Sequence, residues 1–512
     1  MFSAVSIFLS AEAANVDNII PAPHDHSGYE ELKGPFTTAF EVTEACLSCH
    51  ENTADEIHAT SHWQWKSLEN ENLGKYSRSL NNFCIATPGS EAFCTSCHIG
   101  YGWKDPNFDF SSNNAIDCLV CHDTTGLYTK QDAGMPKLLD KPDGSPTFLD
   151  DIALNVGTPG RDNCGGACHF KGGGGDGVKH GDLDSSLTNP PRELDVHMAA
   201  DGANFACQEC HTTREHQVAG RSYTTPAFDE FKSLVDDHNM SKLPCTSCHS
   251  DTPHKDKLAA KLNDHTDTVA CQTCHIPALA RGGLPTKVSW DWSTAGKLKD
   301  GKPYEDKNEE GKTIYASKKG DFIWEHNVAP VYFWYNGAMS YITIDDKIDD
   351  SQRVTINHPL GDVNDPRARI MPFKRHIGKQ PYDTVNMTML QPDVAGNGTE
   401  EADAAAFWKH FNWANSLAVG TKIRGQEFSG EFDFIDTEFF YPSTHMVAPK
   451  EDALKCAECH NANGRLKDVA GVYMPAQKHF EWIEILGWLM VGFTTLVSII
   501  HLVLRIINRR RG

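Results

Sequence analysis

The sequence predicts a mostly irregular and α-helical fold that wraps around bound prosthetic groups, with a small β-hairpin region and one C-terminal transmembrane helix. Three observations lead to this prediction. Only 39% of the 512 residues are hydrophobic, so aliphatic side chains alone do not supply the core of a chain this long. The 17 cysteines recur in a single short motif, and an uncharged apolar run lies near the C-terminus.

The cysteines form eight pairs, each with a histidine directly after the second cysteine, and Cys84 is left over. Seven pairs have the spacing Cys-x-x-Cys-His, the attachment motif of covalent c-type haem. Zinc ribbons place their partner ligands elsewhere, and disulfide scaffolds do not require the histidine. The sequence therefore predicts a multihaem cytochrome c wrapped around eight covalently bound haem c groups. The pairs are Cys46/Cys49, Cys94/Cys97, Cys118/Cys121, Cys164/Cys168, Cys207/Cys210, Cys245/Cys248, Cys271/Cys274 and Cys456/Cys459, and the histidines are His50, His98, His122, His169, His211, His249, His275 and His460.

One motif departs from the common spacing. Cys164 and Cys168 are separated by an extra residue, and they open the stretch CGGACHFKGGGGDGVKHGD, residues 164–182. The inserted residues 165–167 are small enough to bulge, so we expect haem attachment there as well. The run of four glycines that follows lets the backbone come close to a flat ring without a side-chain clash.

Each iron needs a second axial ligand besides the motif histidine, and neutral imidazole is the commonest donor. The chain has 25 histidines, enough to supply these ligands after the motifs are served. His24 and His26 are set aside because they lie in the N-terminal tail, and His501 because it lies in the apolar run. The candidates closest in sequence to a motif are His62, His216, His254, His265 and His445, and the second set is His58, His180, His197, His358 and His376.

Both ends of the chain indicate export and membrane attachment. Residues 1–14 are an apolar run followed by an Ala-x-Ala pattern, which is typical of a secretory signal, although a basic start is missing. Ile485–Leu504 carries no charge and, as a helix of about 30 Å, matches a bilayer core. Arginines follow it at 505 and 509–511, so we expect a cytoplasmic tail and an ectodomain on the periplasmic face of the cytoplasmic membrane.

Motif density divides the chain into segments. The divisions are a signal-like segment at 1–14, an N-terminal tail at 15–45, a seven-haem region with the active-site haem at 46–280, a second region with the eighth haem at 281–470, and a membrane anchor at 471–512 with its helix at 485–504.

The second region carries the predicted regular structure. Asp321–Asp345 is rich in aromatic and β-branched residues and is interrupted at Asn336-Gly337, which predicts a β-hairpin. Glu400–Val419 has apolar residues at helical spacing and predicts one helix.

The charge and the anchor limit the partners. A formal net charge of −22 excludes nucleic acid. The membrane helix indicates a membrane partner, either a quinol-linked or a cytochrome b-type subunit. His501, one turn before Arg505, is either an interfacial histidine or faces a haem b or quinol site in that subunit.

Several motifs together resemble the octahaem tetrathionate reductase family, a branch of the multihaem cytochromes related to pentahaem nitrite reductase and hydroxylamine oxidoreductase. The resemblance extends from Cys46 to Leu466. Its motifs are NNFC at 81–84, the stretch 164–182, CQTCHIPALARGG at 271–283, INHPLG at 356–361, PFKRHIGKQPYD at 372–383 and HMVAPKEDALKCAECH at 445–460.

The resemblance implies seven bis-histidine haems and one haem whose iron is bound by a lysine. By motif, that lysine is Lys179, the active-site haem is the one held by Cys94 and Cys97, and the substrate pocket contains the three residues Asp176, Asn81 and Cys84. The membrane helix departs from the soluble members of the family.

The chemistry of the residues agrees with this assignment. A lysine must lose its proton to bind iron, which costs about 4–5 kcal/mol at pH 7 from a pKa near 10.4, so the Lys179–iron bond is the displaceable one. Asp176, three residues earlier, is placed to take or hold that proton. Cys84 is either a buried structural thiol or a thiol that exchanges with a sulfur–sulfur bond of substrate.

These observations lead to an expected function with open alternatives. We expect a membrane-anchored octahaem reductase that passes quinol-derived electrons to a small inorganic sulfur or nitrogen substrate: tetrathionate, nitrite or hydroxylamine. The alternatives are a non-catalytic electron relay between a membrane partner and another redox protein, and the same site working as an oxidase. The direction of electron flow depends on haem potentials, which the sequence does not determine.

Overall fold

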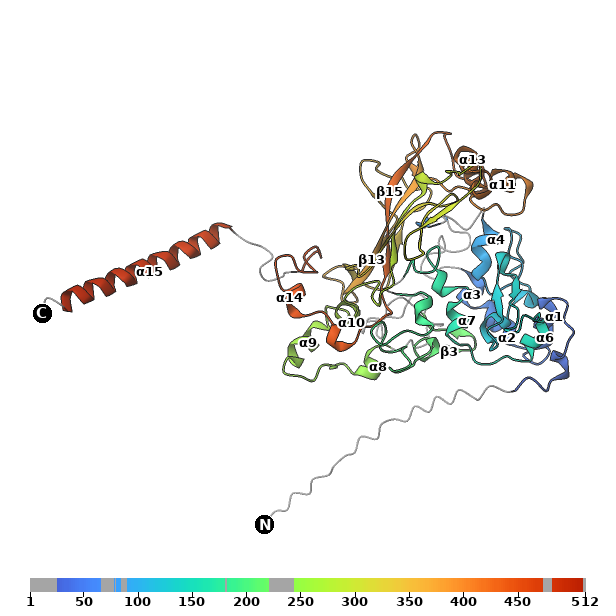
Figure 1. Ribbon diagram of the computed structural model, residues 1–512, viewed down its shortest axis with the longest axis horizontal. Coiled ribbons are helices and arrows are strands. Elements are labelled where there is room, and N and C mark those ends of the chain that lie inside the picture. Colours follow the sequence, from blue (N-terminus) through green and yellow to red (C-terminus); the bar gives the residue numbers. More distant parts are fainter. Residues whose placement is uncertain are drawn as a thin grey trace, which may run out of the picture.

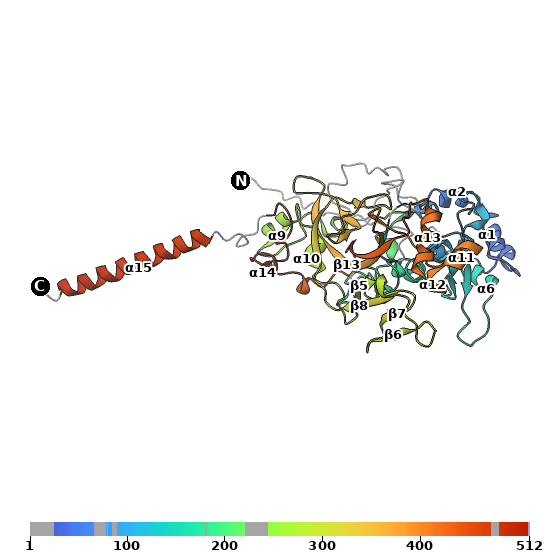
Figure 2. The same ribbon diagram turned by 90° about the horizontal axis from the view of Figure 1, so that it is seen from above.

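The computed structural model describes residues 25–65, 78, 80–83, 90–179, 182–220, 244–472 and 481–509. Short helices and loops of the motif-rich half form one layer, and a long twisted sheet from the second region stands on it (Figure 1). One long helix, α15, leaves the molecule at one end, and Figure 2 shows the same separation from above. The signal-like residues 1–14 and His24 lie outside the described residues.

The helices of the motif-rich half are short because several of them are the haem motifs themselves. Two cysteines at i and i+3 with a histidine at i+4 share one face of a helical turn, and this arrangement presents all three to one ring. α10 contains a complete motif, Cys271–His275. The helices are α1 Ala39–Leu47, α2 Thr53–His58, α3 Ser61–Gln64, α4 Glu91–Cys94, α5 Leu119–His122, α6 Leu149–Ala153, α7 Arg161–Gly165, α8 Thr246–His249, α9 Ala259–His265, α10 Cys271–His275, α11 Glu400–Ala405, α12 Phe407–His410, α13 Trp413–Arg424, α14 Cys456–Cys459 and α15 Glu481–Arg509.

The second region is built on a nine-stranded sheet, which is more β structure than the predicted hairpin. Its order is β11-β15-β13-β5-β8-β7-β6, and β9 and β14 also pair with β13. The strands of this sheet are β5 Thr286–Asp291, β6 Glu305–Lys307, β7 Thr313–Ala316, β8 Gly320–Glu325, β9 Val331–Tyr335, β11 Val354–Thr355, β13 Arg369–Asp383, β14 Thr388–Met389 and β15 Phe432–Pro442. Two-stranded pairs are formed by β1 Tyr128–Lys130 with β2 Pro136–Leu138, β3 Thr213–Arg214 with β4 Gln217–Val218, and β10 Met339–Tyr341 with β12 Asn357–Pro359.

The predicted hairpin across Asn336-Gly337 is wrong. β8 pairs with β5 and β7, β9 pairs antiparallel with β13, and β10 pairs with β12. The aromatic residues that suggested a hairpin are used in packing instead: Tyr332 and Trp334 of β9 are buried in a cluster with Ile370 of β13. Burial against a long central strand therefore outweighs the local turn signal.

The single helix predicted for Glu400–Val419 is divided into α11, α12 and α13. Ala406 has extended geometry and Phe411 has φ +54°. The Asn412 side chain then accepts a hydrogen bond from the Asn415 amide and begins α13. The break brings the Phe407 and Trp413 rings together, 3.9 Å apart, in the aromatic cluster under the sheet.

The C-terminal helix α15 is long and apolar enough to cross a membrane, and Trp482–Arg509 has no buried share in this structure. Its large apolar side chains are exposed throughout, as expected of a helix whose surface is covered by lipid.

Because α15 buries nothing against the ectodomain, deleting residues 473–512 should release a water-soluble protein with its full haem content. The thermal midpoint should stay within a few degrees of the full-length value. Haem absorbance per protein in the soluble fraction and a melting curve measure both quantities. A truncated protein that is haem-free or unfolded would show that the tail is part of the fold.

Candidate functional site

The sixteen attachment cysteines that the structure describes lie at or near the surface of the protein, and none of them is fully buried. A c-type haem is attached through the edge of its ring, so the cysteine has to reach this edge and does not need to lie in a core. The exposed motif cysteines are Cys49, Cys121, Cys210, Cys245, Cys248 and Cys456, and the other ten are half-buried.

Seven of the eight motif histidines face a second histidine among the residues that the structure describes. Their ring centroids lie 6.0–6.5 Å apart. The pairs are His50 with His26 at 6.4 Å, His122 with His216 at 6.4 Å, His169 with His62 at 6.0 Å, His211 with His445 at 6.1 Å, His249 with His197 at 6.1 Å, His275 with His254 at 6.5 Å and His460 with His265 at 6.0 Å.

This spacing fits an iron held between two imidazoles, because metal–imidazole bonds are about 2 Å long. The second ring nitrogen supports the fit. In six of these histidines Nδ1 lies near an oxygen acceptor, which fixes the proton on Nδ1 and leaves Nε2 as the metal donor. The acceptors are Gly157 O for His122 at 2.8 Å, Ala219 O for His211 at 2.8 Å, the Glu56 carboxylate for His216 at 2.6 Å, Asn263 Oδ1 for His254 at 2.9 Å, Lys261 O for His265 at 2.6 Å and the Asp182 carboxylate for His445 at 3.1 Å.

Burial keeps several of these imidazoles in the neutral form that binds metal. Burial, and then the charges of His62 and Lys179, lower the pKa of His169 to about 4. Burial also lowers the pKa of His62. At neutral pH His169 of the stretched motif and the facing His62 are therefore neutral, and their donor nitrogens carry no proton.

The pairs cross from one motif to another. His216 follows the Cys207/Cys210 motif in sequence but faces His122, and His254 follows the Cys245/Cys248 motif but faces His275. The sequence-based exclusion of His26 is wrong, since His26 lies opposite His50. Nearness in sequence to a motif thus selected most of the histidines that are paired in the structure, but it does not indicate which motif histidine each of them faces.

Two of the predicted ligands are held within the sheet instead. The His358 Nδ1 lies 2.7 Å from Pro359 O, and its ring packs on Phe333 and Phe440. His376 is 1% exposed and contacts Asn82 through Nδ1. With seven motif histidines already paired in the described chain, neither is needed as an axial ligand. His58, also a candidate, packs its ring against Trp63 at 4.7 Å.

His98, the eighth motif histidine, lies in a different environment. Its ring is fully buried, and its Nε2 lies 2.8 Å from Trp63 O, while Nδ1 accepts a hydrogen bond from the Gly100 amide at 3.1 Å. The roles of the two ring nitrogens in His98 are therefore the reverse of those in the six paired histidines with an acceptor at Nδ1. Binding of iron by the His98 Nε2 requires the loss of its contact with Trp63 O. The rings around it are Trp63, Trp65, Trp103, Phe108 and Phe110.

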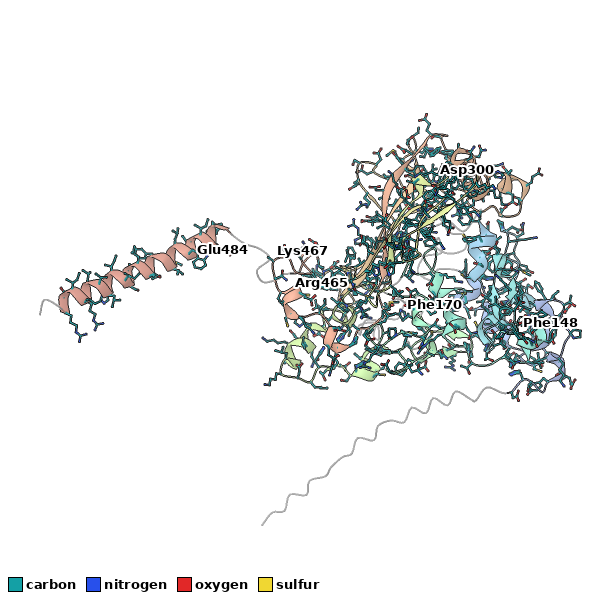
Figure 3. All side chains as sticks on the ribbon, viewed as in Figure 1. Phe148, Phe170, Asp300, Arg465, Lys467 and Glu484 are labelled. Carbon is teal, nitrogen blue, oxygen red and sulfur yellow. The ribbon has the colours of Figure 1, made fainter. Side chains whose placement is uncertain are left out.

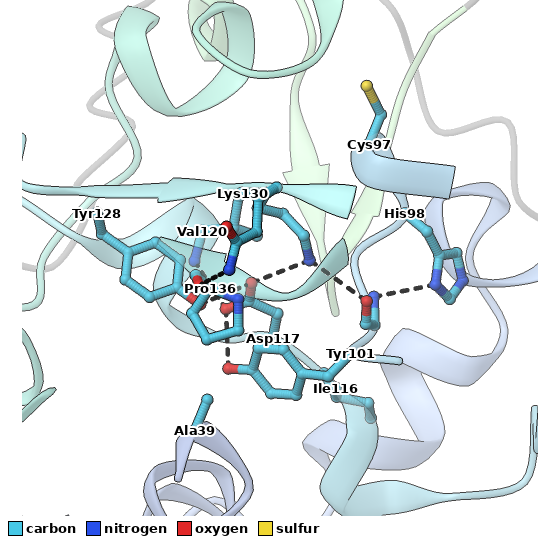
Figure 4. Close-up of polar contacts among 12 residues, drawn as sticks. Ala39, Cys97, His98, Tyr101, Ile116, Asp117, Val120, Tyr128, Lys130 and Pro136 are labelled. Atoms are coloured by element: carbon cyan, nitrogen blue, oxygen red, sulfur yellow. Dashed lines mark hydrogen bonds and ion pairs between the residues drawn. The ribbon is translucent and has the colours of Figure 1, made fainter. Parts of the chain in front are cut away.

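A buried polar cluster around Asp117 supports the backbone behind His98 (Figure 4). The Lys130–Asp117 ion pair is almost fully buried, and Lys130 also donates to Gly100 O at 3.4 Å. A Cβ on Gly100 would lie 2.8 Å from the His98 ring, so this position requires glycine. The cluster therefore fixes the second haem motif relative to the third. The Asp117 carboxylate accepts from Tyr101 at 3.0 Å, Tyr128 at 2.9 Å, Lys130 at 3.0 Å and the Val120 amide at 3.1 Å.

The glycine tract brings the Lys179 loop against the segment that contains Asn81. A Cβ on Gly174, which has φ +99°, would lie 2.7 Å from Phe83 Cβ. The Asn81 side chain accepts from the Phe83 amide at 2.9 Å and so shapes this turn. The two segments predicted to share a pocket are therefore neighbours. Cys84 and His180 lie outside the described residues.

Lys179 pairs with Asp182 and not with Asp176. The Lys179 Nζ lies 3.6 Å from the Asp182 carboxylate, which also binds His445. Asp176 is exposed, and its carboxylate accepts from the Ser185 amide and hydroxyl at 3.0 and 2.5 Å. The expectation that Asp176 holds the Lys179 proton is therefore wrong, since the carboxylate paired with Lys179 is that of Asp182, three residues later.

Burial raises the pKa of the Asp182 carboxyl, but the hydrogen bond and charge of His445 and the charge of Lys179 outweigh it and hold that pKa well below its usual range. Asp182 thus stays ionised and links Lys179 to His445, a member of the pair with His211. The Lys179 Nζ also lies 5.9 Å from the centre of the Tyr441 ring.

Sequence reasoning also missed Lys374, a lysine on β13 that is 2% exposed. Its Nζ donates to the Thr286 hydroxyl at 2.6 Å and to the Val178 carbonyl. Burial, followed by the charge of Lys287, lowers the pKa of Lys374 well below its ordinary value. Lys374 therefore holds the backbone directly before Lys179. The available signal was a lysine on the inward face of a strand, two positions from His376.

The second and fourth haem motifs are in contact, which brings the Cys94/Cys97 site close to the start of the lysine stretch. The Cys97 Sγ lies 3.3 Å from Ala167 O, within the insert of the stretched motif. The Cys168 Sγ lies 3.9 Å from Cys97 O.

Comparisons with known proteins place the relatives of this chain among the multihaem c-type cytochromes. Residues 287–463 match the family model "Cytochrome c bacterial", and residues 45–123 match "Cytochrome c554 and c-prime". The crystal structure of an octahaem cytochrome c from Shewanella oneidensis is similar, with a TM-score of 0.74 and 43% identity over 89% of this chain and 97% of that chain. An uncharacterized protein of Archaeoglobus fulgidus is 27% identical over 251 residues, covering 39% of this chain and 82% of that protein.

We expect Asp182→Asn to lower the free energy of unfolding by about 1.5–3 kcal/mol at pH 7, because hydrogen bonds to a charged acceptor contribute that much. The pKa of Asp182 is depressed in the folded state, so its contribution is present above pH ~4 and is lost as the pH falls below that value. The difference between the native protein and the variant should therefore shrink at pH 3.

Asp176→Asn is the matched control, because it removes an exposed carboxylate from the same loop and should cost less than about 1 kcal/mol. Denaturant titrations at pH 7 and pH 3 measure both variants. Equal losses in the two variants, or an Asp182→Asn loss unchanged at pH 3, would contradict the assignment.

Proposed function

Because this chain belongs to the octahaem cytochromes c, we propose that it is an octahaem reductase, anchored in the membrane, that transfers electrons to a small inorganic substrate. Its cofactor is covalently bound haem c. Such haems supply one-electron transfer and, where one axial position opens, a binding site for substrate. The proposed number of haems is eight, one for each cysteine pair.

One observation carries this proposal, namely the contrast between seven paired motif histidines and the differently surrounded His98. Paired imidazoles occupy both axial positions and suit electron transfer. A site held by a weaker second ligand suits catalysis, since that ligand can leave. The Cys94/Cys97 motif is the one whose histidine has different surroundings. It contacts the Cys164/Cys168 motif, and the loop that ends in Lys179 follows that motif.

The residues around Lys179 support its role as the displaceable ligand. A lysine amine binds iron only after losing its proton, and Asp182 at 3.6 Å is the group nearest to hold that proton. Lys374 holds this loop through Val178 O, and the Tyr441 hydroxyl donates at 2.9 Å to Asn82 in the neighbouring segment. The loop is thereby positioned by buried side chains while the amine itself is half-buried.

We propose tetrathionate, nitrite and hydroxylamine as the substrates to test. Tetrathionate takes up two electrons, its central sulfur–sulfur bond breaks, and two thiosulfate ions leave. Cys84, two residues beyond Asn82, is proposed to lie beside this site. Tetrathionate is the substrate for which a thiol adds chemistry, because a thiolate exchanges with sulfur–sulfur bonds.

A relay without turnover is the second candidate function. His50 at one end of the motif series and His265 with His460 at the other are exposed, which leaves both ends open to redox partners. Turnover of the three substrates with a reduced dye decides between the two functions, since a relay oxidises the dye only when a protein partner is added.

Lys179→His should convert the displaceable site to one with two imidazoles, because histidine binds iron without the cost of deprotonation. We expect one distinct haem signal to be replaced by a low-spin signal like the others and dye-driven turnover to fall at least a hundredfold. Absorption and electron paramagnetic resonance spectra measure the first, and steady-state assays the second. If both remain as in the native protein, Lys179 is not an iron ligand.

Cys84→Ser should lower tetrathionate turnover at least tenfold and nitrite turnover less than about threefold, because nitrite has no sulfur–sulfur bond to exchange. Parallel assays with the same reduced dye measure the two rates. Equal losses with both substrates would make Cys84 a packing residue.

A further inference from the structure

The last haem motif and the point where the chain continues to the membrane helix lie in one packed cluster. Val472, the last described residue before α15, belongs to the apolar cluster that also contains Cys459. The Trp334 indole donates to Ala470 O at 2.7 Å, and the Arg465 guanidinium binds Pro277 O at 2.6 Å. The segment from Cys459 to Val472 is thus held against the ectodomain. The other members of the cluster are Tyr332, Trp334, Ala368, Ile370, Leu466, Val469 and Val269.

Chain length limits how far this cluster can lie from α15. Nine residue steps connect Val472 to Glu481, and fully extended chain covers about 30 Å in that distance. Arg465 and Lys467 lie at the end of the ectodomain that is nearer to the helix that carries Glu484 (Figure 3). α1 and α2 lie at the opposite end (Figure 1). With α15 in the bilayer, the Cys456–His460 motif stays near the membrane surface.

The same motif is open to solvent. Cys456, His460 and His265 are all exposed, and the two histidine rings face each other at 6.0 Å. His265 is held by its Nδ1–H bond to Lys261 O at 2.6 Å, and Val269 N donates to His265 O at 2.7 Å. The segment that carries the last motif therefore lies at the surface of the ectodomain, where a redox partner reaches the edge of the ring that it holds.

A series of motif contacts connects this end to the Cys94/Cys97 site. The Leu454 amide of the last motif segment donates to Cys274 O at 2.9 Å, and the Ala448 amide donates to His275 O at 2.8 Å. Ala448 lies three residues after His445, the partner of His211. From there the Cys207 thiol contacts the Cys164 thiol, and the Cys97 Sγ meets Ala167 O. Motifs eight, seven, five, four and two are therefore successive neighbours.

We propose that the surface around Cys456, His460 and His265 is the docking site of a membrane-embedded quinol-oxidising subunit, and that electrons enter the protein there. This inference rests on the proposed reductase function and identifies its partner. A quinol is oxidised to the quinone and gives up two electrons and two protons. The electrons pass singly to the last motif, and the protons are released to the solvent on the outer face.

Spacers inserted between Val472 and Glu481 test the role of the short connection. A rigid helical spacer of twenty residues moves the ectodomain about 30 Å further from the bilayer, whereas a flexible Gly/Ser spacer of equal length still allows it to return. The measurement is haem reduction by decyl-ubiquinol in membranes of the source cells, followed by absorbance without added substrate. We expect the rigid spacer to slow reduction at least tenfold and the flexible spacer less than threefold.

Dye-driven reduction should be unchanged in both spacer variants. Equal quinol-driven rates in the rigid-spacer and native proteins, or no quinol-driven reduction of the native protein, would overturn the inference. Dye-driven substrate turnover is assayed separately, so a failure of the reductase function is recognised independently.

Substitution of one ligand at each end of the series tests the point of entry. His265→Met and His26→Met each mark one haem by its altered spectrum and raise its potential in the same direction. When quinol is added, the altered haem of His265→Met should be reduced in the earliest kinetic phase, as seen from its spectrum. The altered haem of His26→Met should be reduced in a later phase. The reverse order, or identical phases, would contradict entry at the last motif.

Discussion

The arrangement of the motif-rich half depends on seven pairs of facing histidine rings, and six of these histidines have an oxygen acceptor at Nδ1. Apolar clusters also hold these short helices and loops together, such as the one that packs Val42 of α1 against Leu119 of α5. Each pair joins two distant segments, as His445 joins the end of the sheet to the motif at Cys207 and His26 joins the N-terminal segment to His50. The acceptors of the Nδ1 protons, such as Gly157 O and the Asp182 carboxylate, therefore contribute to the fold as much as the histidines do.

The sheet serves as the platform for the lysine loop. The inward face of β13 presents Lys374, His376 and Gln380 to two loops that the chain delivers from far away in sequence. Lys374 binds the backbone before Lys179, His376 contacts Asn82, and Gln380 donates to Asn81 O at 2.6 Å. Because these polar groups are buried, each requires a partner, and their partners are the loops of the candidate site. The second region thus contributes to the site although it carries only the last haem motif.

The haem motifs, the apolar C-terminal helix and most of the paired histidines were predictable from the sequence, because these features depend on short spacings. Which motif histidine each of the other histidines faces was not predictable, since His216 and His254 face motifs other than the ones they follow in sequence. The same limit explains the errors about Asp176 and the hairpin at Asn336-Gly337. Asp176 and the hairpin were both inferred from local spacing. In the structure, the contact with His445 places Asp182 beside Lys179, and burial against β13 determines the pairing of β9.

The central claim is that seven irons are held by two histidines and the eighth by a histidine and Lys179. Near-infrared magnetic circular dichroism of the fully oxidised protein measures this most directly, because the energy of the charge-transfer band reports the axial ligand pair of each low-spin haem. The account predicts a bis-histidine band with seven times the intensity of a single histidine–amine band, and loss of the latter in Lys179→Ala. A single bis-histidine band that accounts for all eight haems would contradict it.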